Sequence, residues 1–305
     1  MRSPFDLADD ASYHAWRDAK LAAYPRDIAE LVVPVADPRA LTSAEMRALQ
    51  DRVARANMVI YHAPHLPAAD KSLPKKLGEQ LGLFRLEGNY LADEDGLSSI
   101  TPNEDESHVR GDYIPYTHKP INWHTDGYYN ALDKRILGMS LHCAQDAETG
   151  GKNALLDHEI AYIQLRDRNP DFIAALMQPD AMTIPARMDD DNVARPEQSG
   201  PVFSVDPVDG FLHMRYTART RSIAWKSDAA TQAAVQAMAD ILATSEYTLT
   251  ARMTPGMGLI CNNVLHTRSG FSDSPGHRRL LYRGRYYDRP RFDLTVPPTL
   301  PCVNR

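Results

Sequence analysis

The chain has few cysteines and no long apolar run, and each shortage excludes a class of protein. Its three cysteines, Cys143, Cys261 and Cys302, lack the paired spacing of zinc-binding motifs. We therefore expect reduced thiols in a cytoplasmic protein. No stretch approaches the roughly 18 apolar residues that a membrane span needs, and the amino terminus has no apolar signal region. A membrane partner is not expected.

A broad excess of positive charge is also missing. The formal net charge is -6, from 34 basic and 40 acidic residues. The basic residues are scattered except in one segment, "HRRLLYRGRYYDRPR". A nucleic-acid partner is not expected, because phosphate backbones are bound by broad basic surfaces. The interleaved arginines and apolar residues instead suggest a strand whose inward arginines meet small carboxylates.

The pattern of apolar residues predicts an α+β protein that is mainly β. Residues 1–96 alternate helical and strand-like stretches, including a capping-box signature at Thr42 and Glu45, and we expect them to form a layer beside a β core. Residues 97–288 contain short β-prone runs between turn residues, among them "DYIPYT" at 112–117, with helices inserted. Such spacing is typical of an antiparallel sandwich or barrel. We expect a single domain over 1–305, with residues 289–305 as an outer tail.

The stretch "NWHTDGYYN" contains a candidate metal site. His124 and Asp126 project from the same face if this stretch is a strand, because strand side chains alternate. His266, which follows the apolar run in "GLICNNVLHTRSGF", is the best third ligand. Two histidines and one carboxylate form the facial triad that leaves open positions on Fe(II). The H-x-D pattern alone is also compatible with an ordinary half-buried strand.

A second motif, "RRLLYRGRYY", adds weight to a site for an acid. Arg279, Arg283 and Arg285 share one face of a strand here. An arginine that points into a sheet interior is costly unless a carboxylate meets it. A surface-facing basic strand is the alternative. The nearby His266 favours an acidic cosubstrate beside the metal.

Four segments together give the chain a family resemblance: "NWHTDGYYN", "LHCAQDAETGGKNALLDHEIAYIQL", "CNNVLHTRSGF" and "HRRLLYR", in this order. Over roughly residues 98–288 it resembles the superfamily of taurine dioxygenase (TauD/TfdA) and gamma-butyrobetaine hydroxylase. These are Fe(II)/2-oxoglutarate-dependent oxygenases. The resemblance implies a double-stranded β-helix, or jelly-roll, core with the metal at one open end.

The resemblance also implies roles for individual residues. His124, Asp126 and His266 would bind Fe(II), and Arg279 would hold the distal carboxylate of 2-oxoglutarate. Asn153 stands where taurine dioxygenase has a threonine that assists this carboxylate. With O2, the enzyme would convert 2-oxoglutarate to succinate and CO2 while it hydroxylates a small anionic or zwitterionic metabolite, with fragmentation or desaturation as further outcomes.

Four residues are candidates for contacting the primary substrate: Arg283, Tyr128, Tyr129 and Arg215. Arginines suit a sulfonate, phosphonate or carboxylate, whereas tyrosines could cage a quaternary amine. Arg283 has an alternative role in the cosubstrate site, and the tyrosines could be wall or core packing. The acidic stretch 188–192 lies where the family often has a mobile lid.

Two other functions remain open from the sequence. One is a catalytically silent jelly-roll that binds a small acid through its arginines. The other is an enzyme that uses a different divalent metal on the same fold. The intact triad argues against the first, and the inward arginines argue against the second. The family resemblance also makes a homodimer or tetramer plausible.

Overall fold

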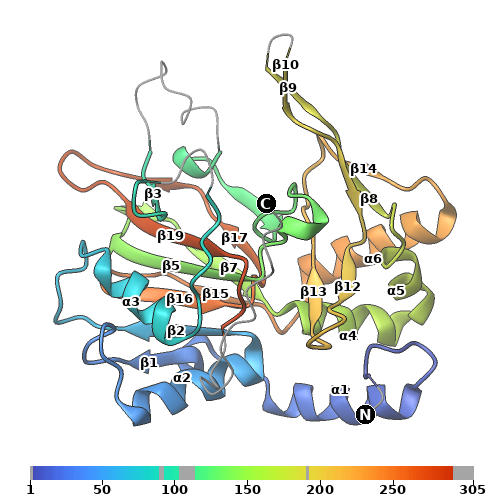
Figure 1. The fold of residues 1–305 in the computed structure, drawn as a ribbon, viewed down its shortest axis with the longest axis horizontal. Helices are drawn as coiled ribbons and strands as arrows, with labels where there is room; N and C mark the ends of the chain where they lie inside the picture. Colours follow the sequence, from blue (N-terminus) through green and yellow to red (C-terminus); the bar gives the residue numbers. More distant parts are fainter. Residues whose placement is uncertain (1–2, 89–92, 103–113, 190–191, 291–305) are drawn as a thin grey trace, which may run out of the picture.

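In the part of the chain that the structure describes, two large sheets and six helices form the body (Figure 1). The structure is a computed structural model, and it describes residues 3–88, 93–102, 114–189 and 192–290. This arrangement confirms a mixed α and β protein. The expected tail at 289–305 lies outside the described residues except for 289 and 290.

The larger sheet has six strands in the order β1-β2-β16-β5-β19-β3. Their bounds are β1 Val32–Pro34, β2 Met58–His62, β16 Met257–Cys261, β5 Gly138–Gln145, β19 Leu280–Tyr286 and β3 Ser98–Ile100. β1 and β2 pair in parallel, and the other neighbours are antiparallel. The expectation of a separate N-terminal layer was therefore wrong for these two strands. Pairing between β2 and β16 makes them part of the core sheet.

The smaller sheet has four strands in the order β15-β7-β17-β4 and carries two of the predicted metal ligands. Its strands are β15 Leu249–Ala251, β7 Asn153–Leu156, β17 Leu265–Arg268 and β4 Ile121–His124. One hydrophobic cluster joins the two sheets, since it contains Leu155 and Leu265 together with Leu259 and Leu281. Within the smaller sheet, His266 lies directly opposite His124 in register.

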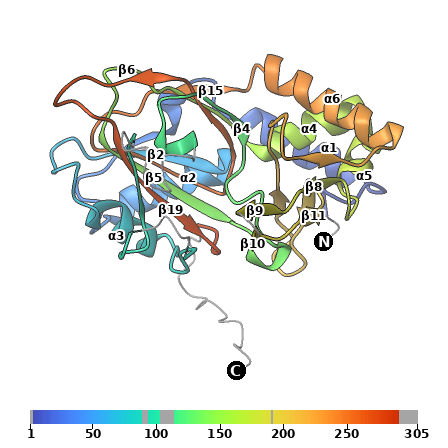
Figure 2. The same ribbon diagram turned by 90° about the horizontal axis from the view of Figure 1, so that it is seen from above.

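Helices cover the sheets in two groups, which Figure 2 separates clearly. They are α1 Asp10–Ala23, α2 Ser43–Ala56, α3 Ser72–Gln80, α4 His158–Arg168, α5 Pro170–Leu176 and α6 Ala229–Thr244. The predicted capping box is confirmed, because Thr42 and Glu45 bond reciprocally at the start of α2. Leu49 of α2 and Leu77 of α3 share a buried cluster with Tyr286 of β19. α4, α5 and α6 pack on one another at the opposite end.

Between α5 and α6 the chain forms several short strands. They are β8 Met182–Ile184, β9 Arg187–Asp189, β10 Asn192–Arg195, β11 Gln198–Gly200, β12 Phe203–Val205, β13 Leu212–Met214 and β14 Ala224–Trp225. β9 and β10 pair as a hairpin that projects from the body (Figure 1). The expected lid at 188–192 falls in this hairpin, and residues 190 and 191 lie outside the described part.

A strand was expected at 112–117, and this prediction was wrong for the residues of this stretch that the structure describes. Residues Ile114–Tyr116 form a short 3-10 turn. Arg268 of β17 explains the difference, because its guanidinium donates to the carbonyl oxygens of residues 114, 115, 117 and 119 at 2.5–3.2 Å. These carbonyls therefore face one buried cation instead of a neighbouring strand.

Replacing Arg268 by alanine is expected to lower the free energy of unfolding by about 2–4 kcal/mol, since several part-buried carbonyls would lose their donor. Arg268 is 4% exposed, so water reaches those carbonyls poorly. Urea unfolding followed by circular dichroism measures the change. The exposed Arg47 on α2 is a matched control, and its replacement by alanine should change stability by less than about 0.5 kcal/mol. Equal effects of the two substitutions would contradict the bracing role of Arg268.

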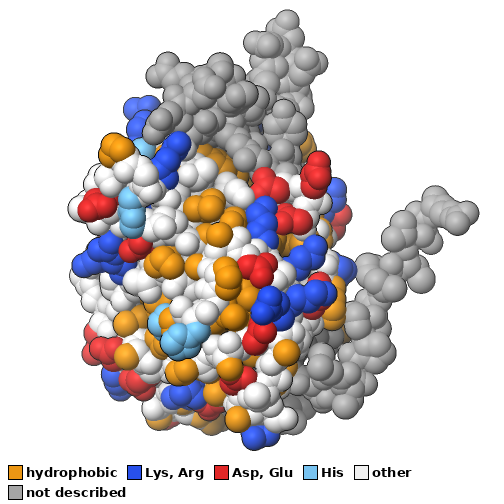
Figure 3. All heavy atoms as spheres, turned by 90° about the vertical axis from the view of Figure 1, so that its left-hand side faces the viewer, with side chains coloured by type: hydrophobic (Ala, Val, Ile, Leu, Met, Phe, Trp, Pro, Cys, Tyr) orange, Lys and Arg blue, Asp and Glu red, His pale blue; other side chains and the backbone are white. Residues whose placement is uncertain are grey.

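The surface facing the viewer in Figure 3 mixes acidic, basic and apolar side chains. This face agrees with the scattered charges of the sequence. Among the described residues, no helix is both long enough and apolar enough to cross a bilayer.

Candidate metal centre

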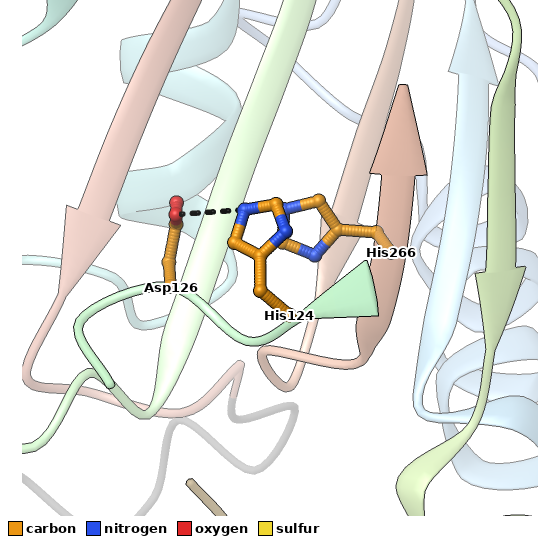
Figure 4. A group of neighbouring side chains, drawn as sticks. All are labelled: His124, Asp126 and His266. Carbon is orange, nitrogen blue, oxygen red and sulfur yellow. Dashed lines mark ion pairs between the residues drawn. The ribbon is translucent and has the colours of Figure 1, made fainter. Parts of the chain in front are cut away.

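The three predicted metal ligands meet at one point (Figure 4). His124 is the last residue of β4, Asp126 lies in the turn that follows, and His266 projects from β17. One ligand atom from each lies within 4.8 Å of the others. His124 Nε2 is 3.8 Å from Asp126 Oδ1, and the two imidazole centroids are 4.2 Å apart. A residue pattern of weak specificity in the sequence thus becomes a compact cluster.

Main-chain contacts orient both imidazoles in the same way. His124 Nδ1 donates to the carbonyl of Asn122 at 2.9 Å, and His266 Nδ1 donates to the carbonyl of Val264 at 2.9 Å. A carbonyl oxygen can only accept, so each Nδ1 carries the proton. Each Nε2 is therefore left with its lone pair for a metal.

The turn that carries Asp126 is held by a residue that the sequence did not single out. Asn263 accepts a hydrogen bond from the Asp126 main-chain N–H at 2.8 Å and donates to the Asp126 and Ile136 carbonyls at 2.9 and 2.8 Å. Gly127 has φ of 68°, and a Cβ there would lie 2.4 Å from Ile136 Cγ1. This turn therefore requires glycine. The only sequence signal for Asn263 was its place shortly before His266.

Charge and burial leave the cluster ready to bind a cation. Burial, together with the neighbouring His266, lowers the pKa of His124 to about 3, so its ring is neutral. Burial alone would raise the pKa of Asp126, but Arg283 and Arg285 nearby lower it overall and keep the carboxylate ionised. Asp126 Oδ2 is buried and has no hydrogen-bond partner among the described residues. Two imidazoles that each leave an Nε2 lone pair free, with one ionised carboxylate, fit a divalent metal that keeps open positions.

Arg279 provides a buried positive charge near the start of β19. Its side chain is 4% exposed, and its guanidinium carbon lies 5.0 Å from the Phe271 ring centroid. No carboxylate of the described residues lies within ion-pair distance of it; Asp273 acts on it only from further away. Burial lowers the pKa of Arg279 to about 10, which leaves it charged. A buried guanidinium of this kind is stabilised when an acid binds to it.

Asn153 lies at the start of β7 and is 7% exposed. Its Nδ2 donates to the Thr267 carbonyl at 2.8 Å, and its Oδ1 is buried without a partner among the described residues. The side chain is thus anchored beside the strand of His266. Its contact with a cosubstrate remains a prediction.

β19 presents its two other arginines toward the metal ligands. Arg283 Nη1 is 3.4 Å from Asp126 Oδ1, and its Nε is buried without a partner among the described residues. Arg285 forms an ion pair with Glu87 and donates to the Tyr129 hydroxyl at 2.6 Å. Tyr286 packs on the opposite face of the strand. Arg283 and Arg285 thus share one face of β19, as the sequence predicted. Arg279 precedes the strand, and the register shifts between Leu280 and Leu281.

Tyr128 and Tyr129 lie beside the metal ligands. The Tyr128 ring meets the His124 ring edge-on with centroids 6.5 Å apart, and the Tyr129 ring is 5.2 Å from Tyr128. The Tyr128 hydroxyl accepts a hydrogen bond from Arg219 Nη1 at 2.8 Å. Arg219 was missed by the sequence reasoning, because only the folded chain brings its loop to Tyr128.

The expectation that Arg215 contacts substrate needs correction. Arg215 is 3% exposed, and its guanidinium donates to main-chain carbonyls at four positions. The acceptors are Tyr128 at 2.7 Å, Gln198 at 2.8 Å, Met182 at 2.9 Å and Gly200 at 3.4 Å. All three of its guanidinium nitrogens already donate to the main chain, so Arg215 braces the wall behind Tyr128.

Fold and site together define a class: a 2-His-1-carboxylate centre, with a buried arginine available for an acid, on two packed sheets. Residues 19–285 match the model of the taurine catabolism dioxygenase TauD, TfdA family. The chain belongs to this family. The resemblance read from the four sequence motifs is confirmed.

Two curated relatives carry the description uridine-5'-phosphate dioxygenase. The protein from Amycolatopsis sp is 31% identical over 175 residues, which cover 55% of this chain and 62% of that protein. The protein from Streptomyces sp is 26% identical over 205 residues, which cover 65% of this chain and 72% of that protein. The chain thus aligns with less than two thirds of the Amycolatopsis relative.

Solved structures with a similar fold include two iron oxygenases. Asparagine oxygenase, in complex with Fe(II), 3-hydroxyasparagine and succinate, has a TM-score of 0.57 at 17% identity, covering 94% of this chain and 86% of that chain. The non-heme iron oxygenase OrfP, in complex with Fe and alpha-ketoglutaric acid, has a TM-score of 0.55 at 16% identity, covering 81% and 80%. At these identities the likeness concerns the fold.

Proposed function

We propose that this protein is an Fe(II)/2-oxoglutarate-dependent oxygenase that hydroxylates a small anionic metabolite. The observation that carries the proposal is the meeting of His124, Asp126 and His266. The same chain also holds Arg279, a buried cation without an acid partner among the described residues. Membership in a dioxygenase family supports the same reaction. We also propose that residues 1–305 form one cytoplasmic domain whose two sheets make a jelly-roll core. The single cluster that joins the sheets and the buried free thiols of Cys143 and Cys261 support this.

Each residue of the site has a defined task in this proposal. The triad holds Fe(II), Arg279 binds the distal carboxylate of 2-oxoglutarate, and Asn153 supports the same end of the cosubstrate. When bound, Fe(II) and 2-oxoglutarate would supply the oxidative chemistry, which uses O2 and yields succinate and CO2. Tyr128 packs edge-on against His124 and limits access of water to the metal side.

Uridine 5'-phosphate is the first substrate to test. Two relatives are described as dioxygenases of this nucleotide. The arginines around the tyrosine pair support an anion more than a quaternary amine, because their charges would repel a cation. Succinate release is then measured with a panel of anions, including uridine 5'-phosphate, uridine, taurine and amino acids. Coupled turnover should rise most with the correct substrate.

Anaerobic spectroscopy tests the proposed class without knowledge of the substrate. Addition of Fe(II) and 2-oxoglutarate should give the weak visible charge-transfer band of the chelate. A catalytically silent acid-binding protein would bind 2-oxoglutarate equally well with and without Fe(II). An enzyme that uses a different metal would show neither the charge-transfer band nor succinate release. Either result would reject the oxygenase.

Arg283→Ala is expected to raise KM for an anionic substrate by about 10–100-fold, because a charge-assisted contact near the metal is lost. Arg283 also lies 3.4 Å from Asp126, so the substitution should shift the anaerobic band as well. Steady-state kinetics and the spectrum are recorded on the same preparation. Arg283→Lys keeps the charge and should recover part of the affinity. An unchanged KM would remove Arg283 from the substrate site.

A further inference from the structure

Two arginines outside the strand of Arg279 and Arg283 surround the tyrosine pair. Arg219 comes from the exposed loop after β13, and its Nη1 lies 2.8 Å from the Tyr128 hydroxyl. Arg195 ends β10, and its guanidinium carbon lies 5.9 Å from the Tyr129 ring centroid. The centroids of the two tyrosine rings are 5.2 Å apart. The two cations therefore lie beside one aromatic platform, formed by Tyr128 and Tyr129.

Neither arginine is neutralised by the part of the chain that the structure describes. Arg219 has the Tyr128 hydroxyl as its hydrogen-bond partner, and Arg195 donates to the carbonyls of Pro185 and Pro196 at 2.6 and 3.5 Å. No carboxylate within these described ranges lies at ion-pair distance from either one. Arg285, by contrast, also touches Tyr129 but is paired with Glu87. Counting only the described residues, the cluster therefore has a local excess of positive charge.

The positive charges of Arg195 and Arg219 repel each other. Burial lowers the pKa of Arg195, and Arg187 and Arg219 lower it further, although Tyr128 and Tyr129 act in the opposite direction. An anion placed between the guanidinium groups would remove this repulsion and accept hydrogen bonds from both. A phosphate monoester has about two negative charges and three acceptor oxygens at neutral pH, which matches two cations better than a carboxylate does.

The platform also connects solvent to the metal ligands. Arg219 is exposed, Tyr128 is 9% exposed, and the Tyr128 ring lies 6.5 Å from the His124 ring between their centroids. A molecule anchored at Arg219 and Arg195 would thus extend along Tyr128 toward the metal. Such a molecule has a phosphate at one end and an oxidisable carbon within reach of the centre.

We propose that Arg195 and Arg219 form a subsite for the phosphate group of the primary substrate. The Tyr128 hydroxyl lies between the loop of Arg219 and the metal ligands. The inference rests on the proposed oxygenase function and specifies its substrate class as a phosphate monoester. The subsite explains how one site can hold two acids: 2-oxoglutarate at Arg279 and the substrate phosphate at the platform. The carboxylate position at Arg279 and the phosphate position at Arg195 and Arg219 are formed by different strands and loops.

Charge-removing variants test the subsite. Arg219→Gln keeps a donor for the Tyr128 hydroxyl, and Arg195→Gln keeps one for the Pro185 carbonyl, so both retain the local contacts of folding. Binding of uridine 5'-phosphate, uridine and inorganic phosphate is measured by calorimetry on the anaerobic Fe(II)/2-oxoglutarate protein. Each single variant should weaken uridine 5'-phosphate binding by about 10-fold and the double variant by about 100-fold. The preference of the parent for the phosphorylated over the unphosphorylated ligand should shrink by the same factors.

Arg221→Ala is the matched control, because Arg221 is an exposed arginine in the same loop as Arg219. It should change binding by less than about 2-fold, since a solvated charge without direct contact is screened. Retention of the full phosphate preference in the double variant would overturn the proposal. Failure of the parent to bind either phosphate compound would also overturn it. These outcomes are separate from the oxygenase proposal, because the charge-transfer band reports on the metal and 2-oxoglutarate alone.

Discussion

His266→Ala is expected to abolish coupled succinate formation, with kcat lowered by at least about 1,000-fold, because one of three metal ligands is removed. His266 lies opposite His124 in register, and its Nδ1 is fixed by the Val264 carbonyl. No other described side chain belongs to the cluster that could take its place. Succinate is measured by a coupled assay, and Fe(II) affinity is measured by anaerobic titration.

The exposed His65 provides the control for this substitution. His65→Ala should retain the kcat of the parent within about 2-fold, since surface substitutions away from a site have small effects. His266→Gln tests whether an oxygen or amide ligand can substitute at the same position. If His266→Ala retained both Fe(II) binding and succinate release, the metal centre would have to be placed elsewhere.

Part of the candidate site could be predicted from strand geometry, which relates residues that are two apart. His124 and Asp126 were assigned to one face from that rule, and the structure places them together although Asp126 lies just beyond β4. The inward arginines of β19 followed from the same rule. Local periodicity therefore indicated the pair His124 and Asp126 and the arginines of β19, whereas His266 was proposed from its place after an apolar run.

Contacts between distant segments could not be read in this way. Asn263 holds the turn of Asp126 through three hydrogen bonds, yet the two residues are 137 positions apart. Arg215 looked like a substrate ligand by residue type alone, and only its four main-chain acceptors show that it braces the wall. The role of an arginine depends on which carbonyls or carboxylates lie next to it in the folded chain.

Arg268 and Arg279 illustrate the same dependence within one patch. Both guanidinium groups lie over the Phe271 ring, with carbon-to-centroid distances of 4.9 and 5.0 Å. Arg268 has main-chain carbonyls as acceptors, whereas Arg279 has no hydrogen-bond or ion-pair partner among the described residues. Both terminal nitrogens of Arg268 already have acceptors, although its Nε has none among the described residues. Our proposal is that Arg279 finds its acceptor when an acid binds.

Arg279→Ala is expected to raise KM for 2-oxoglutarate by about 100-fold or more, because a buried, charge-assisted bidentate contact is lost. Arg279→Lys should fall between the alanine variant and the parent, since it keeps the charge but not the planar fork. The neighbouring Arg278 is exposed and serves as the control. Arg278→Ala should change KM by less than about 3-fold. If Arg278→Ala raised KM for 2-oxoglutarate more than Arg279→Ala did, the cosubstrate contact would have to be assigned to Arg278.

Thermal stability separates a ligand-binding arginine from a structural one. In the ligand-free protein Arg279 is a buried charge without an acid partner in the described chain, so its removal relieves a desolvation cost. The ligand-free Arg279→Ala protein should therefore melt at the same temperature as the parent or higher. The parent should gain several degrees when Fe(II) and saturating 2-oxoglutarate are added, and the variant should lose most of this gain at the same concentrations, because stabilisation by a ligand follows its affinity. A large fall in the melting temperature of the ligand-free variant would instead show that Arg279 supports the fold, as Arg268 does.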